Sequence, residues 1–364
     1  MKLHGPRLRC TVTSILLLAT AIAALSCDVS GPGDDCISNP APVFTHMFTD
    51  LSLVQSIVPL GNSSGGAIKE RHQVQVLTDT TPADATSGRS VPIIAPAAAR
   101  MKAVRRFRTT QPFVDDYYGF ELQISCEVTA RFDHVRMPGD KLSAAVGGYT
   151  NGFVDPERST SFAAGETIAY TDGNPPAPAG VNSAFAFDYA LYDSRHENTF
   201  ANMNRYRGTP DLALSLRAVC GGSYYQGGLR SAFNAKLGYA GNSANGDCRS
   251  ASRDVPGSLA GGWFRVGRSI NDDGGRLAFA TEAGGVARLT ISYSTFFFFR
   301  PYHATGTVNR DPALATGTTP WCHTDNSSEV WLQLSADGMR MSMEQRTGTC
   351  TSAAPSSYAM QWER

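Results

Sequence analysis

The chain lacks an excess of charge of either sign. Its 364 residues include 32 lysines and arginines and 32 aspartates and glutamates, so the formal net charge is zero. Binding to a phosphate backbone needs clustered positive charge, so we expect no nucleic acid partner. Charged residues are only 18% of the chain, while glycine and proline number 35 and 20. This composition is typical of a turn-rich β protein rather than of a helical bundle.

Several functional motifs are also missing. The sequence has no internal repeat, coiled-coil heptad pattern, phosphate-binding glycine loop or dinucleotide fingerprint, and no Cys-x-x-Cys spacing that would favour a cysteine metal site. The Gly-Asn-Ser-Ser-Gly segment at residues 61–65 fits the nucleophile-elbow pattern, which requires a helix after the serine. Residues 72–77 alternate like a strand instead. We therefore interpret residues 61–65 as a hairpin turn and reject Ser63 as a nucleophile.

The first 26 residues have the pattern of a signal peptide. Lys2, Arg7 and Arg9 precede an apolar run at residues 12–25 that is too short for a stable membrane span. The Ala-Leu-Ser before Cys27 resembles a lipobox, which would place a lipid anchor on Cys27, but it also suits an ordinary signal peptidase. We favour lipidation, with residues 27–43 as a polar tether. Both alternatives predict export: a membrane-anchored lipoprotein facing the periplasm or exterior, or a secreted protein.

The remaining cysteines agree with export. They are even in number, as expected of a disulfide framework, and comprise Cys36, Cys126, Cys220, Cys248, Cys322 and Cys350. Six cysteines allow fifteen pairings. We prefer the local pairs Cys220–Cys248 and Cys322–Cys350, which leave Cys36 to pair with Cys126.

The pattern along the mature chain predicts a mainly β protein of two domains. Residues 90–193 hold short apolar or alternating runs separated by glycine, proline and aspartate, which is typical of small antiparallel sheets. A polar segment places the domain boundary near residue 200, giving domains 44–199 and 200–364. Short helices are expected around Cys220. The last hundred or so residues then predict an antiparallel β barrel or sandwich.

The N-terminal half resembles the lysostaphin/LytM-like zinc metallopeptidase domain of exported bacterial proteins. Residues 92–95 (Pro-Ile-Ile-Ala) match its first strand motif. His134 in Phe-Asp-His-Val stands where the family has a Tyr-x-His-Leu histidine, and residues 164–170 match a glycine hairpin. The family's final His-x-His falls on residues 186–188 (Ala-Phe-Asp), so one histidine is absent and the other is Asp188.

The resemblance implies a set of site residues. It assigns metal ligation to His72 and Asp188 and a catalytic role to His134. A zinc hydrolase needs three protein ligands and an open position for water, so two ligands indicate a degenerate site. We therefore expect no cofactor, with zinc as the alternative. A groove for an extended ligand would be lined by tyrosines, foremost Tyr118, Tyr170 and Tyr189 with Tyr117 and Tyr192 beside them; the alternative is that these are core and rim residues.

Three functions follow as hypotheses. The first is an exported cell-envelope protein whose inactive peptidase-like domain binds cell-wall glycan or peptide. The second is an active zinc metalloendopeptidase that cleaves peptidoglycan cross-links, with His134 as general base or oxyanion partner. The third is a structural or adhesive surface protein that acts through its C-terminal domain. Zinc content separates the first two, since a hydrolase requires stoichiometric metal.

Overall fold

The computed structural model describes residues 36–79, 88–109, 115–150, 152–174, 184–239, 242–272, 274–282, 285, 287–292, 296–299, 308–324 and 327–364. The predicted signal peptide, the lipidation site Cys27 and the first part of the tether lie outside these ranges. Of the described residues, 41% lie in strands and 11% in helices, which confirms the mainly β fold class. Within the described ranges, no helix has both the length and the apolar character needed to cross a membrane.

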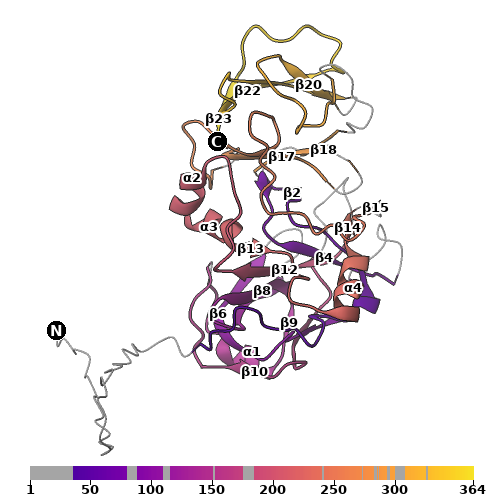
Figure 1. Cartoon of the computed structure of the whole chain (residues 1–364), viewed down its shortest axis with the longest axis vertical. Helices are drawn as coiled ribbons and strands as arrows, with labels where there is room; N and C mark the ends of the chain where they lie inside the picture. The colour runs from indigo at the N-terminus through magenta and orange to yellow at the C-terminus, as the bar shows by residue number, and fades with distance from the viewer. Residues whose placement is uncertain are drawn as a thin grey trace, which may run out of the picture.

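The N-terminal half is built on one antiparallel sheet, shown in indigo and magenta in Figure 1. One of its inner strands, β12 (Ala186–Asp193), is buried along almost its whole length, with Asp188 the one partly exposed residue. The short β13 (Ala218–Val219) also pairs with β12. The strands in spatial order are β1 (Val54–Ile57), β4 (His72–Val76), β12, β8 (Val128–Val135), β7 (Asp115–Gln123), β6 (Ala99–Thr109) and β10 (Ser161–Phe162).

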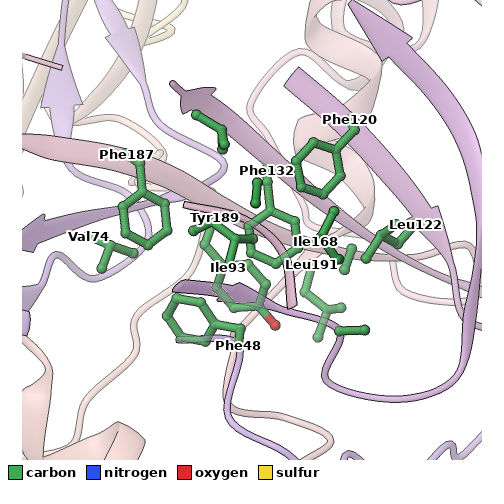
Figure 2. Close-up of a cluster of buried hydrophobic side chains, with 14 of the residues drawn as sticks. Phe48, Val74, Ile93, Phe120, Leu122, Phe132, Ile168, Phe187, Tyr189 and Leu191 are labelled. Carbon is green, nitrogen blue, oxygen red and sulfur yellow. The ribbon is translucent and has the colours of Figure 1, made fainter. Parts of the chain in front are cut away.

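One face of this sheet, the inner face, carries the main hydrophobic core. Figure 2 shows its centre, where Phe48 lies against Tyr189 with ring centroids 4.1 Å apart. A small sheet of β5 (Val91–Ile94), β11 (Thr167–Thr171) and β9 (Met137–Pro138) covers this core and adds Ile93 and Ile168 to it. The 3-10 helix η1 (Leu51–Leu53) and α1 (Asp140–Ala145) complete the cover.

The segment after residue 200 contacts both halves. Helices α2 (Met203–Gly208) and α3 (Pro210–Arg217) pack against Phe264 of the C-terminal half. Helix α4 (Gly227–Lys236) instead places Phe233 in the N-terminal core, where Tyr225 and Leu237 also lie. A two-stranded ribbon of β14 (Gly238–Tyr239) and β15 (Asn242–Ser243) follows. Residues 218–248, which the predicted boundary placed in the C-terminal domain, thus contribute core side chains to the N-terminal sheet.

The C-terminal half is a single curled antiparallel sheet, a half-barrel rather than two stacked sheets. Its end strands approach each other, and its concave side buries Trp263, Phe279 and Trp362. The strands in spatial order are β19 (Phe296–Phe299), β18 (Ala287–Ile291), β17 (Arg276–Thr281), β16 (Gly261–Arg265), β23 (Met360–Glu363), β22 (Arg340–Thr347), β21 (Ser328–Leu334) and β20 (Trp321–Thr324).

A hairpin from the N-terminal half reaches the C-terminal sheet. It consists of β2 (Ser63–Ser64) and β3 (Ala67–Ile68), joined by two glycines with positive φ angles, as a tight two-residue turn requires. The Ser63 hydroxyl donates a hydrogen bond to the Arg288 carbonyl at 3.2 Å, and the Gly66 amide donates to Thr290 Oγ1 at 3.1 Å. A hairpin is present as predicted, but its turn is formed by Gly65 and Gly66, and Ser63 lies in a strand and contributes to contacts between the halves.

Three disulfides fasten the fold. They join Cys36 to Cys126, Cys220 to Cys248, and Cys322 to Cys350, the three pairs that the sequence analysis preferred. The first ties the start of the described chain to the turn between β7 and β8, where the Cys126 amide donates to the Ile37 carbonyl. Disulfides persist in oxidising compartments, so this framework agrees with an exported protein.

Candidate functional site

The three residues that the resemblance assigned to the site lie on three neighbouring strands. His72 begins β4, Asp188 lies in β12 and His134 lies near the end of β8. In the sheet register Tyr189 pairs with His72, whereas Asp188 pairs with Gln73. Successive side chains of a strand point to opposite faces, so His72 and Asp188 lie on opposite sides of the sheet. They cannot share one metal ion.

His72 is a buried core residue with both ring nitrogens engaged by the backbone. Its Nδ1 lies 2.8 Å from the Val58 carbonyl oxygen, and its Nε2 lies 3.0 Å from the Gly221 amide nitrogen. The amide can only donate and the carbonyl only accept, which fixes a neutral ring protonated at Nδ1. Burial lowers the pKa of His72 to about 4, although the hydrogen bond to Val58 acts in the opposite direction. His72 is therefore a structural residue of the core, where it hydrogen-bonds two backbone groups.

Zinc does not fit these residues. His72 lies beside Cys220 and Cys248, a grouping that could hold a metal ion only if the cysteines were free, and the two form a disulfide. The grouping of Cys322, Glu329 and Cys350 contains a disulfide in the same way. Thiolate is the form of cysteine that binds metal, so neither grouping offers a zinc centre. We derive no chemistry from zinc.

Acid unfolding should report the state of His72. Between pH 6.5 and about 4 the unfolded chain gains a proton at His72 that the folded chain excludes. The free energy of unfolding should therefore fall as the pH falls, with about 3 kcal/mol lost in this window through His72. Urea denaturation at several pH values should show this slope reduced in His72→Asn and retained in His196→Asn, which alters an exposed histidine. Equal slopes in the two variants would contradict the assignment.

Asp188 and His134 do meet, on the outer face of the sheet, away from the main core. His134 Nδ1 lies 3.3 Å from Asp188 Oδ2, and Arg71 Nε lies 3.0 Å from the same oxygen. Burial opposes ionisation of Asp188, but Arg71 and the hydrogen bond from His134 outweigh it and hold the pKa of this carboxyl below its usual value. The side chains of Asp188 and His134 remain 16% and 26% exposed.

The backbone conformation around His134 explains the direction in which its side chain points. The pairing of β7 with β8 shifts register between Tyr118 and Phe120, and His134 has a φ of 61°, which is unusual for a residue with a side chain. The Asp133 carboxylate accepts a hydrogen bond from the His134 amide at 3.0 Å. The rings of Phe107 and Tyr117 meet the imidazole edge-on, at centroid distances of 5.7 and 5.9 Å.

The contact between Asp188 and His134 determines which ring nitrogen of His134 is free to act. A carboxylate that accepts from Nδ1–H orients the imidazole and leaves Nε2 as the hydrogen-bonding or proton-accepting atom. The backbone at His134 is strained, and the surrounding contacts keep it in this conformation. Residues with a strained backbone cluster at functional sites. His134 is thus the best candidate for direct contact with a ligand on this face.

Several charged residues on this face were missed by the sequence analysis. With Asp188 and His134 they form what we call the outer-face cluster, comprising Arg71, Arg105, Glu121, Arg131, Asp133, His134 and Asp188. Arg105 pairs with the buried Asp133, and Arg131 lies 3.8 Å from Glu121. The Phe153 ring stacks on the guanidinium carbons of Arg105 and Arg131, at 4.8 and 3.8 Å.

A glycine makes room for this cluster. A Cβ at Gly119 would lie 2.8 Å from Asp133 Oδ1 and 2.9 Å from Arg105 Nε, closer than real side chains approach. The signal in the sequence was the two-residue spacing of Arg131 and Asp133 in β8 and of Gly119 and Glu121 in β7, which places each pair on one face.

The predicted tyrosine groove is not formed as expected. Tyr189 is buried in the main core, where it stacks on Phe48, so it cannot line a surface groove; this prediction was wrong. Tyr118 is half-buried beneath the Arg106 guanidinium, at 5.6 Å, and Tyr170 is 48% exposed on the covering sheet. Tyr118 and Tyr170 stay candidates for ligand contact.

Comparison with known proteins adds no relative: no protein-family model, no curated protein and no solved structure matches the chain. The resemblance to the lysostaphin/LytM-like domain thus remains a prediction from the sequence. Function has to be inferred from the chemistry of the side chains themselves.

Proposed function

We propose that this chain is an exported cell-envelope protein that binds cell-wall glycan or peptide on the outer face of its N-terminal sheet, without metal and without hydrolysis. The observation that carries the proposal is the separation of His72 from the pair of Asp188 and His134. A metallopeptidase needs its ligands around one ion. Here His72, which the resemblance assigns to the metal, is a buried core residue, and Asp188 is ion-paired with Arg71.

The outer-face cluster supplies what a binding site needs. His134 offers a hydrogen-bonding nitrogen whose ring is held by Asp188, so little conformational freedom is lost when a ligand binds. Beside it, the Arg105 guanidinium stacks on the Phe107 ring at 4.4 Å, which fixes a group of hydrogen-bond donors next to the imidazole. Donors of this kind suit the hydroxyls of a sugar and the carbonyls of a peptide. The disulfides support a location outside the reducing cytosol.

Co-sedimentation with purified peptidoglycan tests the proposal. We expect the oxidised protein to bind the polymer. His134→Ala should weaken binding about tenfold or more, because the hydrogen bond between the imidazole and the polymer is lost. His196→Ala removes an exposed histidine outside the cluster and should bind like the wild type.

Elemental analysis of the same preparation separates binding from hydrolysis. We expect no stoichiometric zinc after incubation with excess metal and dialysis, and no release of soluble wall fragments. One zinc per chain that disappears in Asp188→Ala would overturn the metal-free assignment. Binding that survives His134→Ala unchanged would instead point to the C-terminal half as the contact surface.

A further inference from the structure

A second candidate site lies in the C-terminal half, in a cavity of about 280 Å³. The segment that follows Cys248 forms one wall, and the end of β17 with the loop near residue 311 forms the other. Its polar lining consists of Arg249, Ser252, Arg253, Asp254, Thr281 and Asp311. The volume suits a small molecule of the size of an amino acid or a single sugar.

Two arginines on one wall have a single, long ion pair between them among the described residues, although Asp247 and Glu282 raise the pKa of both and Asp311 raises that of Arg253. Arg249 Nη1 and Arg253 Nη2 donate to the same acceptor, the Thr281 carbonyl, at 2.6 and 3.2 Å. Arg249 has an ion-pair contact of 4.0 Å with Asp247, whose side chain is 68% exposed, and among the described residues Arg253 has no ion pair. Burial lowers the pKa of both guanidinium groups, and the charge of Arg249 lowers that of Arg253 further.

Both arginines are held by the chain around them, unlike arginines on an open surface. The stem of Arg253 packs on Gly61, where an added Cβ would lie 2.5 Å from Arg253 Cδ. Arg249 follows the disulfide-bonded Cys248 and has a φ of 57°, fixed by a hydrogen bond from its amide to Asp247. Guanidinium groups fixed in this way are preorganised for a planar anion.

Two carboxylates also line the cavity: Asp311 lies on the opposite wall, and Asp254 follows Arg253 on the first wall. Asp311 Oδ1 is occupied by Thr281 Oγ1 and by the Ala313 amide, both at 3.0 Å. Asp254 accepts from the amides of Gly262 and Ala201, at 2.9 and 2.8 Å. These contacts hold the carboxylates in place, and among the described residues none donates a hydrogen bond to the second oxygen of Asp311.

We propose that this cavity binds a small carboxylate that also carries hydrogen-bond donors, with its carboxylate against Arg249 and Arg253 and its donors toward Asp311. The donor could be the ammonium group of an amino acid or the hydroxyls of an acidic sugar, and the chemistry of the walls is the same for both. The site lies outside the outer-face cluster, so its test is independent of the proposed wall binding.

Calorimetric titration of the oxidised chain, residues 28–364, tests the proposal with three probes: L-alanine, D-glucuronate and inorganic phosphate. We expect saturable binding of alanine or glucuronate, and the one that binds more tightly identifies the donor. Arg253→Gln should weaken this binding at least about 30-fold, since one partner of a buried charge pair is lost. Arg268→Gln, which alters an exposed arginine, should change nothing.

Two further variants keep the test valid if Arg253→Gln fails to fold, which circular dichroism would show. Arg253→Lys retains the charge and the stem but loses the planar fork, so binding should weaken while the fold persists. Asp311→Asn should weaken alanine more than glucuronate, because it removes the charge opposite the ammonium group. Absence of saturable binding by both carboxylates, binding of phosphate alone, or binding that is unchanged in folded Arg253 variants would overturn the proposal.

Discussion

Replacement of Phe48 by alanine should lower the free energy of unfolding by about 3–5 kcal/mol, as is usual for a buried phenylalanine. Phe48 is buried at the centre of the main core, stacked on Tyr189 and in edge contact with Phe187 and Phe233. Figure 2 shows it within the cluster, below Tyr189 and Ile93 in the view. The deletion would leave a cavity that rigid strands on one side cannot fill.

Urea denaturation followed by tryptophan fluorescence and circular dichroism would measure this loss. Tyr170→Ala is the matched control, because it removes an aromatic ring of the same size that is 48% exposed on the covering sheet. Its effect should stay within about 0.5 kcal/mol. A loss for Phe48→Ala as small as that of the control would show that the core can collapse around the missing ring.

Removal of the Cys36–Cys126 disulfide by double alanine substitution should cost about 4.6 kcal/mol on the chain-entropy account, because the bond closes a loop of 90 residues. In the folded chain, only the covalent attachment of the first described segment is lost. Hydrogen bonds from Ser38 and Asn39 to Glu127 still hold this segment in place. The effect should therefore arise mostly from the greater freedom of the unfolded chain.

The Cys322–Cys350 bond is the matched comparison, because its loop spans only 28 residues. Its removal should cost about 3.6 kcal/mol on the same account. Differential scanning calorimetry of both double variants would give the two losses. A larger loss for the shorter loop would show that native packing, rather than loop length, decides the contribution of these bonds.

The fold class was readable from the sequence because strand patterns are local. The alternation in β8, for example, needs no knowledge of its neighbours, and the near-continuous apolar run of β12 indicates a strand covered on both faces. The disulfide pairs could be chosen by proximity along the chain. The position of residues 218–248 against the N-terminal sheet depends on long-range packing of Phe233 and Tyr225, for which the local pattern holds no signal.

The site was predicted less well, and the reason is register. The resemblance predicted from the sequence assigned His72 and Asp188 to one site by counting along the chain. Whether they share a face is decided by which residue of β12 pairs with which residue of β4, and a shift by one would have reversed the answer. The pairing of Asp188 with Arg71 and His134 likewise joins residues more than fifty positions apart.

The order of strands in the C-terminal sheet has a consequence for how the protein is made. Strand β23, the latest of these strands in the chain, lies between β16 and β22 and joins the two halves of the sheet. The half-barrel cannot close before residues 360–363 have left the ribosome. Until β23 is available, β16 and β22 lack their shared neighbour, so this sheet is completed only after all of its other strands have been made.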